Sequence, residues 1–180
     1  MTGEHIALLD LNNELREQYD FYTVFGGPHA TFCKDLIEED GVDAICTGEG
    51  DIVFPDFCEK MERGENYWET PTFFVKHEGE IIRNPLNFLV PDLSELEFPD
   101  RKLLYDLDPN LAKMGTKYFM AARGCPYKCS YCINVEMQAI YKQTGENYHR
   151  EKSIKRVIEE IKLARENYGI EFVKFWDETF

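Results

Sequence analysis

The first third of the chain alternates between helical hydrophobic spacing and short apolar runs. Residues 6–19 carry apolar side chains three and four positions apart, which predicts an amphipathic helix. Its apolar positions are Leu8, Leu11, Leu15 and Tyr19. The run at 21–25 predicts a short strand that stops at a Gly-Gly-Pro turn. Thr31 is then expected to cap a second helix that ends at Gly41.

The same alternation continues with a second buried run and a third helix. Residues 42–46 predict another strand, and residues 52–61 predict a helix that tolerates Pro55 because proline is accepted in a first turn. Helices and strands in this order, with a glycine loop after each strand, are typical of a doubly wound parallel α/β sheet. Two strands do not complete such a sheet, so residues 1–64 are expected to hold only part of one.

Residues 65–112 have a different pattern, which indicates a linker. Two alternating runs, 72–76 and 80–83, flank a Glu78-Gly79 turn and predict a β-hairpin. The stretch that follows contains four prolines and has no sustained hydrophobic period. We therefore expect a connecting strap there.

The last part of the chain, residues 113–180, predicts a β-α-β unit. Residues 118–122 form a short apolar run, and Ser153 begins a helix whose apolar positions share one face until Gly169 ends it. Residues 172–176 form a second apolar run. This second strand lacks the helix that would cover it, so we expect a fragment that is truncated at both ends.

Composition and charge limit the classes of protein to be considered. The 180 residues are 43% hydrophobic and 14% aromatic, which is typical of a globular domain and excludes a wholly disordered chain. Twenty Lys and Arg stand against 34 Asp and Glu, and the formal charge of −14 disfavours nucleic acid and anionic membranes as partners. Because no basic-then-apolar N-terminus and no long apolar run occurs, we expect a cytoplasmic protein without a membrane span. Six cysteines are then expected to be free thiols or metal ligands.

Three of these cysteines lie in one short loop directly after a predicted strand: Cys125, Cys129 and Cys132. Three thiolates on so short a loop can converge on one inorganic unit. A structural zinc would need a fourth ligand, whereas an iron-sulfur cluster can be held by three cysteines with one iron left open. The alternative without a metal is a buried stripe of cysteines on a helix, but Gly124 and Pro126 argue against a helix at this place.

The other candidate ligands are less well placed for this loop. Cys33, Cys46 and Cys58 lie on apolar faces of another part of the chain, where a free cysteine is ordinarily buried. His149 is the nearest further candidate, and a solvated loop histidine is its simpler interpretation. A four-ligand zinc or electron-transfer site nevertheless stays open as the alternative.

The cysteine loop resembles the Cys-x-x-x-Cys-x-aromatic-Cys signature of radical S-adenosylmethionine (SAM) enzymes, in the form found in their cobalamin (B12)-binding subfamily. Further landmarks of that subfamily occur in order: Gly26-Gly27-Pro28-His29-Ala30-Thr31, Gly48-Glu49-Gly50-Asp51, Phe98-Pro99-Asp100-Arg101 and Phe175-Trp176-Asp177-Glu178-Thr179-Phe180. The resemblance covers nearly the whole chain. It implies the C-terminal half of a Rossmann-like (flavodoxin-like) cobalamin-binding domain at 1–64, a linker with a β-hairpin at 65–112, and the first β/α unit or units of a radical SAM partial TIM barrel at 113–180.

The resemblance also implies cofactors and ligands for the cysteine loop. The three cysteines would hold a 4Fe-4S cluster whose open iron binds the amino and carboxylate groups of SAM. An electron donor such as flavodoxin or ferredoxin would drive reductive cleavage of SAM to a 5′-deoxyadenosyl radical. Tyr131 matches the position that packs near the adenine, and Asp177 and Glu178 lie where the family contacts the methionyl amino group. Ordinary packing for Tyr131, and a solvated strand end for the two carboxylates, are the alternatives.

Two glycine loops are implied by the same resemblance to bind cobalamin. The residues concerned are Gly26, Gly27, Gly48, Glu49 and Gly50. Glycines after a strand let the backbone approach a ligand at the carboxyl end of a parallel sheet. None of the four histidines has the Asp-x-His-x-x-Gly context that supplies the lower cobalt ligand in the family, so His29 is not expected to bind cobalt.

The sequence therefore predicts a fragment of a cobalamin-dependent radical SAM enzyme. Its expected reaction is methyl transfer or cyclisation on a small molecule or lipid precursor. One alternative is a non-catalytic iron-sulfur or zinc module for electron transfer or scaffolding. Another is a radical SAM enzyme that acts on tRNA, which the charge of −14 does not favour.

Overall fold

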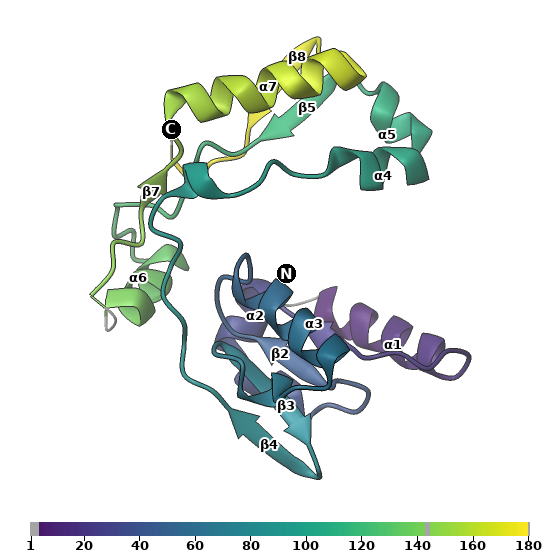
Figure 1. Ribbon diagram of the computed structural model, residues 1–180. Coiled ribbons are helices and arrows are strands. Elements are labelled where there is room, and N and C mark those ends of the chain that lie inside the picture. Colours follow the sequence, from purple (N-terminus) through teal and green to yellow (C-terminus); the bar gives the residue numbers. More distant parts are fainter. Residues whose placement is uncertain (1–3, 143–144, 180) are drawn as a thin grey trace. The chain divides into compact units, whose positions relative to one another are not determined.

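The computed structural model describes residues 4–142 and 145–179, and the chain divides into two compact units, Met1–Phe88 and Leu89–Phe180. Figure 1 shows the helices and strands of each unit. The expected boundaries at 64/65 and 112/113 differ from this division. The difference arises because the hairpin joins the sheet of the first unit, while the strap after residue 88 packs with the second.

A mixed four-stranded sheet forms the centre of the first unit. β1 (Val24–Phe25) pairs in parallel with β2 (Ala44–Cys46), as the doubly wound pattern predicted. β3 (Phe73–His77) and β4 (Glu80–Arg83) then extend the sheet as an antiparallel hairpin, in the order β1-β2-β3-β4 (Figure 1). The hairpin is therefore not part of a linker. Its first strand is buried because its apolar residues pair with β2.

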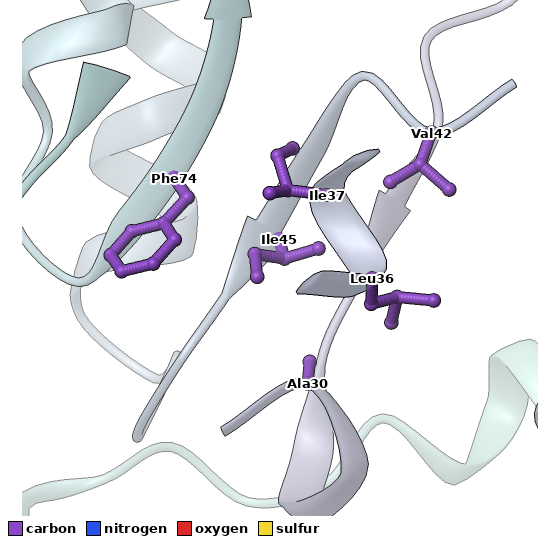
Figure 2. Close-up of a cluster of buried hydrophobic side chains, with 6 residues drawn as sticks. All are labelled: Ala30, Leu36, Ile37, Val42, Ile45 and Phe74. Carbon is purple, nitrogen blue, oxygen red and sulfur yellow. The ribbon is translucent and has the colours of Figure 1, made fainter. Parts of the chain in front are cut away.

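The sheet is covered on both faces, which explains why every position of β2 is buried. One hydrophobic cluster, drawn in Figure 2, consists of Ala30, Leu36, Ile37, Val42, Ile45 and Phe74. A second cluster on the opposite face combines the alternate strand positions Ala44, Cys46, Phe73 and Val75 with two residues of α3 (Val53–Arg63), Val53 and Phe57. The rings of Phe57 and Phe73 stack in this second cluster with their centroids 4.3 Å apart.

The helix after β1 begins earlier than the sequence predicted. α2 (Gly27–Phe32) starts at the glycine turn itself, and a short 3-10 helix (Lys34–Glu38) follows it. Thr31 lies inside α2, where its hydroxyl donates to the Gly27 carbonyl oxygen at 3.0 Å. The prediction that Thr31 caps a helix was therefore wrong. α3 (Val53–Arg63) matches its prediction, with Pro55 in the first turn.

The first helix, α1 (Glu4–Arg16), attaches through Leu9, which packs against the first hydrophobic cluster, and through polar contacts, rather than through its predicted apolar face. The predicted apolar positions are exposed by 39–62%: Leu8, Leu11, Leu15 and Tyr19. Asn12 is buried instead and donates to the Gly41 carbonyl oxygen at 2.9 Å. Arg16 forms an ion pair with Asp43 at 2.6 Å. Hydrophobic spacing predicted the helix correctly but assigned the wrong face to the sheet.

In the second unit, two parallel strands and one helix form the predicted β-α-β unit. β5 (Thr116–Phe119) pairs in parallel with β8 (Phe172–Phe175) after α7 (Ile154–Tyr168). The Ser153 hydroxyl accepts a hydrogen bond from the Arg156 amide at 3.2 Å, which confirms the predicted N-cap.

Several further elements of this unit were not predicted. β6 (Ala122–Arg123) pairs antiparallel with β7 (Arg150–Glu151), and α6 (Asn134–Lys142) lies between them in the chain (Figure 1). The strap contains two short helices, α4 (Arg101–Leu107) and α5 (Pro109–Lys113). Each is capped at its N-terminus by an aspartate side chain that accepts backbone hydrogen bonds, Asp100 for α4 and Asp108 for α5. Both helices are too short to produce a hydrophobic period. The missing period was therefore not evidence that the strap is irregular.

A buried ionic cluster attaches this strap to the β-α-β unit. Glu160 of α7 is 4% exposed and accepts hydrogen bonds from Arg101 at 3.1 Å and from Lys152 at 2.8 Å. Arg101 also donates to the Tyr118 carbonyl oxygen at 2.9 Å, and its guanidinium lies 4.6 Å from the Phe119 ring centroid. These contacts join α4, α7 and β5.

Among the helices of the described residues, none has both the length and the hydrophobicity that a bilayer span requires.

Candidate functional site

The three cysteines lie in the loop of residues 124–133, between β6 and α6. Cys129 is exposed, and Cys125 and Cys132 are half-buried; all three are free thiols. Within residues 4–142 and 145–179, no three His, Cys, Asp or Glu side chains are arranged to hold a single metal ion. A 4Fe-4S cluster sets a less strict geometric requirement on the three sulfurs than a single metal ion does. Each cysteine binds a different iron, so the sulfurs need not converge on one point. Three accessible thiols on one loop fit such a cluster.

The start of this loop requires a glycine. Gly124 has a φ of +77°, a conformation that other residues rarely adopt. A Cβ atom added there would lie 2.5 Å from the Tyr148 carbonyl oxygen, so the loop also passes too close to another backbone segment for any side chain. Gln138 of α6 then fixes the loop by donating to the carbonyl oxygens of Cys125 at 2.7 Å and Tyr127 at 3.0 Å.

We expect Gly124→Ala to destabilise the second unit more than an ordinary glycine substitution does. Gly145 has a similar φ of +81° but no atom within 4 Å of an added Cβ, so Gly145→Ala is a matched control that carries the backbone cost alone, about 1–2 kcal/mol. Gly124→Ala adds the clash with Tyr148 to that cost. Urea unfolding of both variants measures the difference. Equal losses of stability would show that the close approach at Gly124 does not matter.

The two carboxylates after β8 occupy different places. One oxygen of Asp177 accepts hydrogen bonds from the backbone amides of Ala121, at 2.8 Å, and Ala122. The other oxygen is buried and has no hydrogen-bond partner among the described residues. Asp177 therefore fixes the segment between β5 and β6, which leads directly into the cysteine loop.

Glu178 lies against the cysteine loop itself. Partial burial raises the pKa of Glu178 above the usual glutamate value, although hydrogen bonds from the Asn134 side chain and the Gly124 amide oppose the rise. The neighbouring Asp177 charge raises this pKa further. A carboxylate from the end of β8 thus meets the loop that follows β6, and pairing of the strands places it there.

The structure shows no contact that assigns a role in this site to the other predicted residues it describes. Tyr131 is 91% exposed at the loop surface, so its contact with an adenine stays a prediction. His149 is half-buried and lies 3.7 Å from Glu151, rather than fully solvated. Phe180, the last residue of the closing motif, lies outside the described residues.

A cavity of about 500 Å³ adjoins the cysteine loop. Pro126 and Tyr127 of the loop line it together with Asp177. Its apolar wall comes from α7 and β8 and consists of Ile154, Val157, Ile158, Ile161 and Phe175. Polar side chains also line it: His149, Glu151, Lys152 and Thr179. A cavity of this size that combines an apolar wall with polar groups is typical of sites for small organic ligands.

The two glycine loops of the first unit meet at one side chain. A Cβ atom added at Gly26 would lie 3.9 Å from the Cys46 Cβ, and one added at Gly50 would lie 3.7 Å from the Cys46 Sγ. Both loops therefore flank Cys46 at the carboxyl ends of the parallel strands β1 and β2, the edge at which such sheets bind cofactors. The His29 ring stacks on His5 with centroids 4.2 Å apart.

Sequence reasoning missed the polar side chains that support the cysteine loop. Asn134 is buried, and its amide nitrogen lies 3.6 Å from the Cys132 Sγ. Gln138 holds two carbonyl oxygens of the loop. Neither residue belongs to a recognisable motif, and the helix that carries both was not predicted, so no sequence pattern pointed to them.

Comparison with known proteins finds similar sequences among methyltransferases and cyclases, and similar folds among cobalamin-dependent radical SAM enzymes. No family model matches the sequence. The chain is 30% identical over 163 residues to an uncharacterised methyltransferase of Pyrococcus horikoshii, and this match covers 88% of the chain and 34% of the relative. It is 27% identical over 169 residues to the anaerobic magnesium-protoporphyrin IX monomethyl ester cyclase of Rubrivivax gelatinosus, covering 88% of the chain and 28% of the cyclase.

Solved structures show the same relationship at the level of the fold. The radical SAM methyltransferase TsrM from Kitasatospora setae, solved with tryptophan and a SAM analogue, matches with a TM-score of 0.66 at 18% identity, over 98% of the chain and 33% of TsrM. The cobalamin-dependent SAM radical enzyme OxsB, solved with aqua-cobalamin and SAM, matches with a TM-score of 0.67 at 18% identity, over 98% of the chain and 24% of OxsB. The chain is therefore related to the cobalamin-dependent radical SAM methyltransferases and cyclases, and has their α/β fold. It spans about a third or less of their length.

Proposed function

We propose that the chain is part of a cobalamin-dependent radical SAM enzyme that cleaves SAM reductively at a 4Fe-4S cluster. The proposed reaction of the whole enzyme is methyl transfer or cyclisation on a small molecule. The observation that carries this proposal is the three-cysteine loop, which begins at a glycine that accepts no side chain and meets Glu178 from the end of the second parallel strand. The relationship to methyltransferases and cyclases of this kind supports it.

Each part of the site has a separate task in this proposal. Cys125, Cys129 and Cys132 would hold the cluster, which when bound supplies one electron to the sulfonium of SAM. Glu178 has a free side toward solvent and would bind the methionyl amino group. Asp177 instead orients the segment before the loop through the amides of Ala121 and Ala122. We thus assign the two neighbouring carboxylates to different roles, ligand contact for Glu178 and positioning for Asp177.

The first unit is proposed to be part of the cobalamin-binding domain. The two glycine loops on either side of Cys46 leave backbone exposed at the ends of β1 and β2, where a bulky nucleotide tail can lie against it. Gly27 has a φ of +83°, and no atom of the described residues lies within 4 Å of a Cβ added there, so the space next to Gly27 is open.

The charge of the chain bears differently on the two units. Residues 1–88 contain 6 Lys and Arg against 19 Asp and Glu, a formal charge of −13, whereas residues 89–180 contain 14 against 15, a formal charge of −1. The electrostatic argument against nucleic acid therefore applies to the first unit only. The cavity of about 500 Å³ beside the cysteine loop, with its apolar wall, is what favours a small molecule.

Electron paramagnetic resonance tests this proposal. The chain is reconstituted anaerobically with iron and sulfide, reduced, and measured with and without SAM. We expect a 4Fe-4S signal that shifts when SAM is added, because the open iron gains two ligands. A cluster whose signal does not change when SAM is added would support an electron-transfer module instead. One zinc per chain without a cluster would support a zinc module.

A further inference from the structure

Asn134 is a buried amide that touches one of the three cysteine sulfurs. It is the first residue of α6, is 6% exposed, and its Nδ2 lies 3.6 Å from the Cys132 Sγ, within the range for a hydrogen bond to sulfur. We propose that Asn134 sets the reduction potential of the cluster by donating a hydrogen bond to the Cys132 sulfur. This inference rests on the proposed function, because it requires that Cys132 binds a cluster.

The surroundings of Asn134 fix the direction of its amide. The side-chain nitrogen carries two protons and donates one to the Cys132 sulfur, and the Glu178 carboxylate is a neighbouring acceptor. The side-chain oxygen lies 3.3 Å from the Tyr148 hydroxyl, which donates to it. A flipped amide would turn its oxygen toward a carboxylate and a thiolate, both of which are acceptors. The donor therefore faces the sulfur.

Three parts of the unit hold this amide in place. Tyr148 precedes β7, and its ring stacks on Tyr141 of α6 with centroids 5.8 Å apart and an interplanar angle of 11°. Glu178 follows β8. Because the amide is buried and has a partner at each end, it cannot turn away from Cys132 without breaking several hydrogen bonds at once. Such a fixed donor next to a metal ligand acts through the ligand rather than on the substrate.

A donor to a ligand sulfur favours the reduced form of a cluster. Reduction adds one negative charge, part of which lies on the sulfurs, and a hydrogen bond stabilises that charge more strongly in the reduced than in the oxidised form. Removing the donor is expected to shift the reduction equilibrium about tenfold toward the oxidised form. For a one-electron couple, a tenfold change corresponds to a potential about 59 mV more negative.

A redox titration of the reconstituted chain, followed by electron paramagnetic resonance, tests the proposal. Two variants remove the donor: Asn134→Leu, which is close in size, and Asn134→Asp, which places an ionised acceptor beside the sulfur. We expect more negative potentials for both, with the larger shift for Asn134→Asp. Tyr148→Phe is the matched control, because it removes the hydroxyl but keeps the stacked ring and the donor to Cys132. Its potential should shift much less than that of either Asn134 variant, because the donor to Cys132 remains although one hydrogen bond that holds the amide is lost.

The possible outcomes separate this inference from the function on which it rests. If the parent chain takes up no 4Fe-4S cluster, both fail. If the parent and either Asn134 variant load the cluster with equal potentials, Asn134 is only structural and the proposed function stands. If Tyr148→Phe shifts the potential as much as Asn134→Leu, general loosening of the loop is responsible and the inference is overturned. Should Asn134→Leu fold poorly, Asn134→Ala takes its place, since it also removes the donor without adding a charge.

Discussion

Replacing any one of Cys125, Cys129 and Cys132 with alanine is expected to abolish cluster binding. Three ligands on one loop are the minimum that holds a 4Fe-4S cluster with an open iron, so the loss of one leaves two. Loss of a residue that merely supports a metal ligand already costs about 10- to 100-fold in affinity, and loss of a ligand itself costs more. Iron and acid-labile sulfide analysis after anaerobic reconstitution, together with the absorption of the cluster, measures the effect.

The first unit supplies the control for this experiment. Cys33 is a half-buried free cysteine that follows α2, so Cys33→Ala removes a thiol without touching the loop. We expect Cys33→Ala to load as much iron and sulfide as the parent chain. If one of the three loop variants retains a full cluster, the loop is not its binding site. Equal loss on Cys33→Ala would indicate that the iron is bound by thiols without specificity.

The cysteine loop was predictable because its ligands are neighbours in the sequence. Three thiols within eight residues, next to a glycine and a proline, indicate a metal loop without any knowledge of the tertiary fold. Gly124 fits that prediction, since its positive φ lets the chain enter the loop where no side chain could. The β-α-β unit was predictable for a similar reason, because the spacing in α7 and its cap are local features.

Contacts across the second unit could not be predicted in the same way. Glu178 meets Gly124 and Asn134 because β5 and β8 pair in parallel and so bring the ends of distant segments together. The sequence identified the carboxylates after β8, but it did not distinguish Asp177, which binds backbone amides, from Glu178, which contacts the loop. That distinction depends on strand register, which the hydrophobic pattern of a short strand determines only weakly.

The first unit shows a different limit of sequence patterns. Apolar spacing in α1 predicted a helix but the wrong face, because a buried Asn12 and the Arg16–Asp43 ion pair attach the helix to the sheet. Hydrophobic periodicity detects only apolar contacts and cannot recognise attachment by hydrogen bonds. The hairpin was likewise found but misplaced, since a hairpin pattern does not reveal which strand it joins.

Loss of the Glu160 carboxylate is expected to destabilise the second unit strongly. Its side chain is 5% exposed and lies between two cations, Arg101 and Lys152, whose side chains are each 16% exposed. The pairing joins the strap to α7 and holds Arg101 against β5. Replacing the whole cluster with apolar side chains is often neutral, but removing only the carboxylate leaves two largely buried cations without a counter-charge.

We expect Glu160→Leu to destabilise the second unit by about 3–5 kcal/mol, the cost of breaking a buried ion pair on one side. Glu159→Gln is the matched control, because Glu159 is the adjacent residue of α7 and is half-exposed. Its carboxylate lies 3.9 Å from the Lys155 ammonium, and exposed pairs of this kind contribute about 0.3–0.5 kcal/mol to stability. Hydrogen-deuterium exchange resolves the two units separately. Amides of α7 should exchange about 100-fold faster or more in Glu160→Leu, while those of β2 and β3 keep the rates of the parent chain. Unchanged exchange in α7 would mean that Arg101 is held by the Tyr118 carbonyl and the Phe119 ring without help from Glu160, since these are its other contacts.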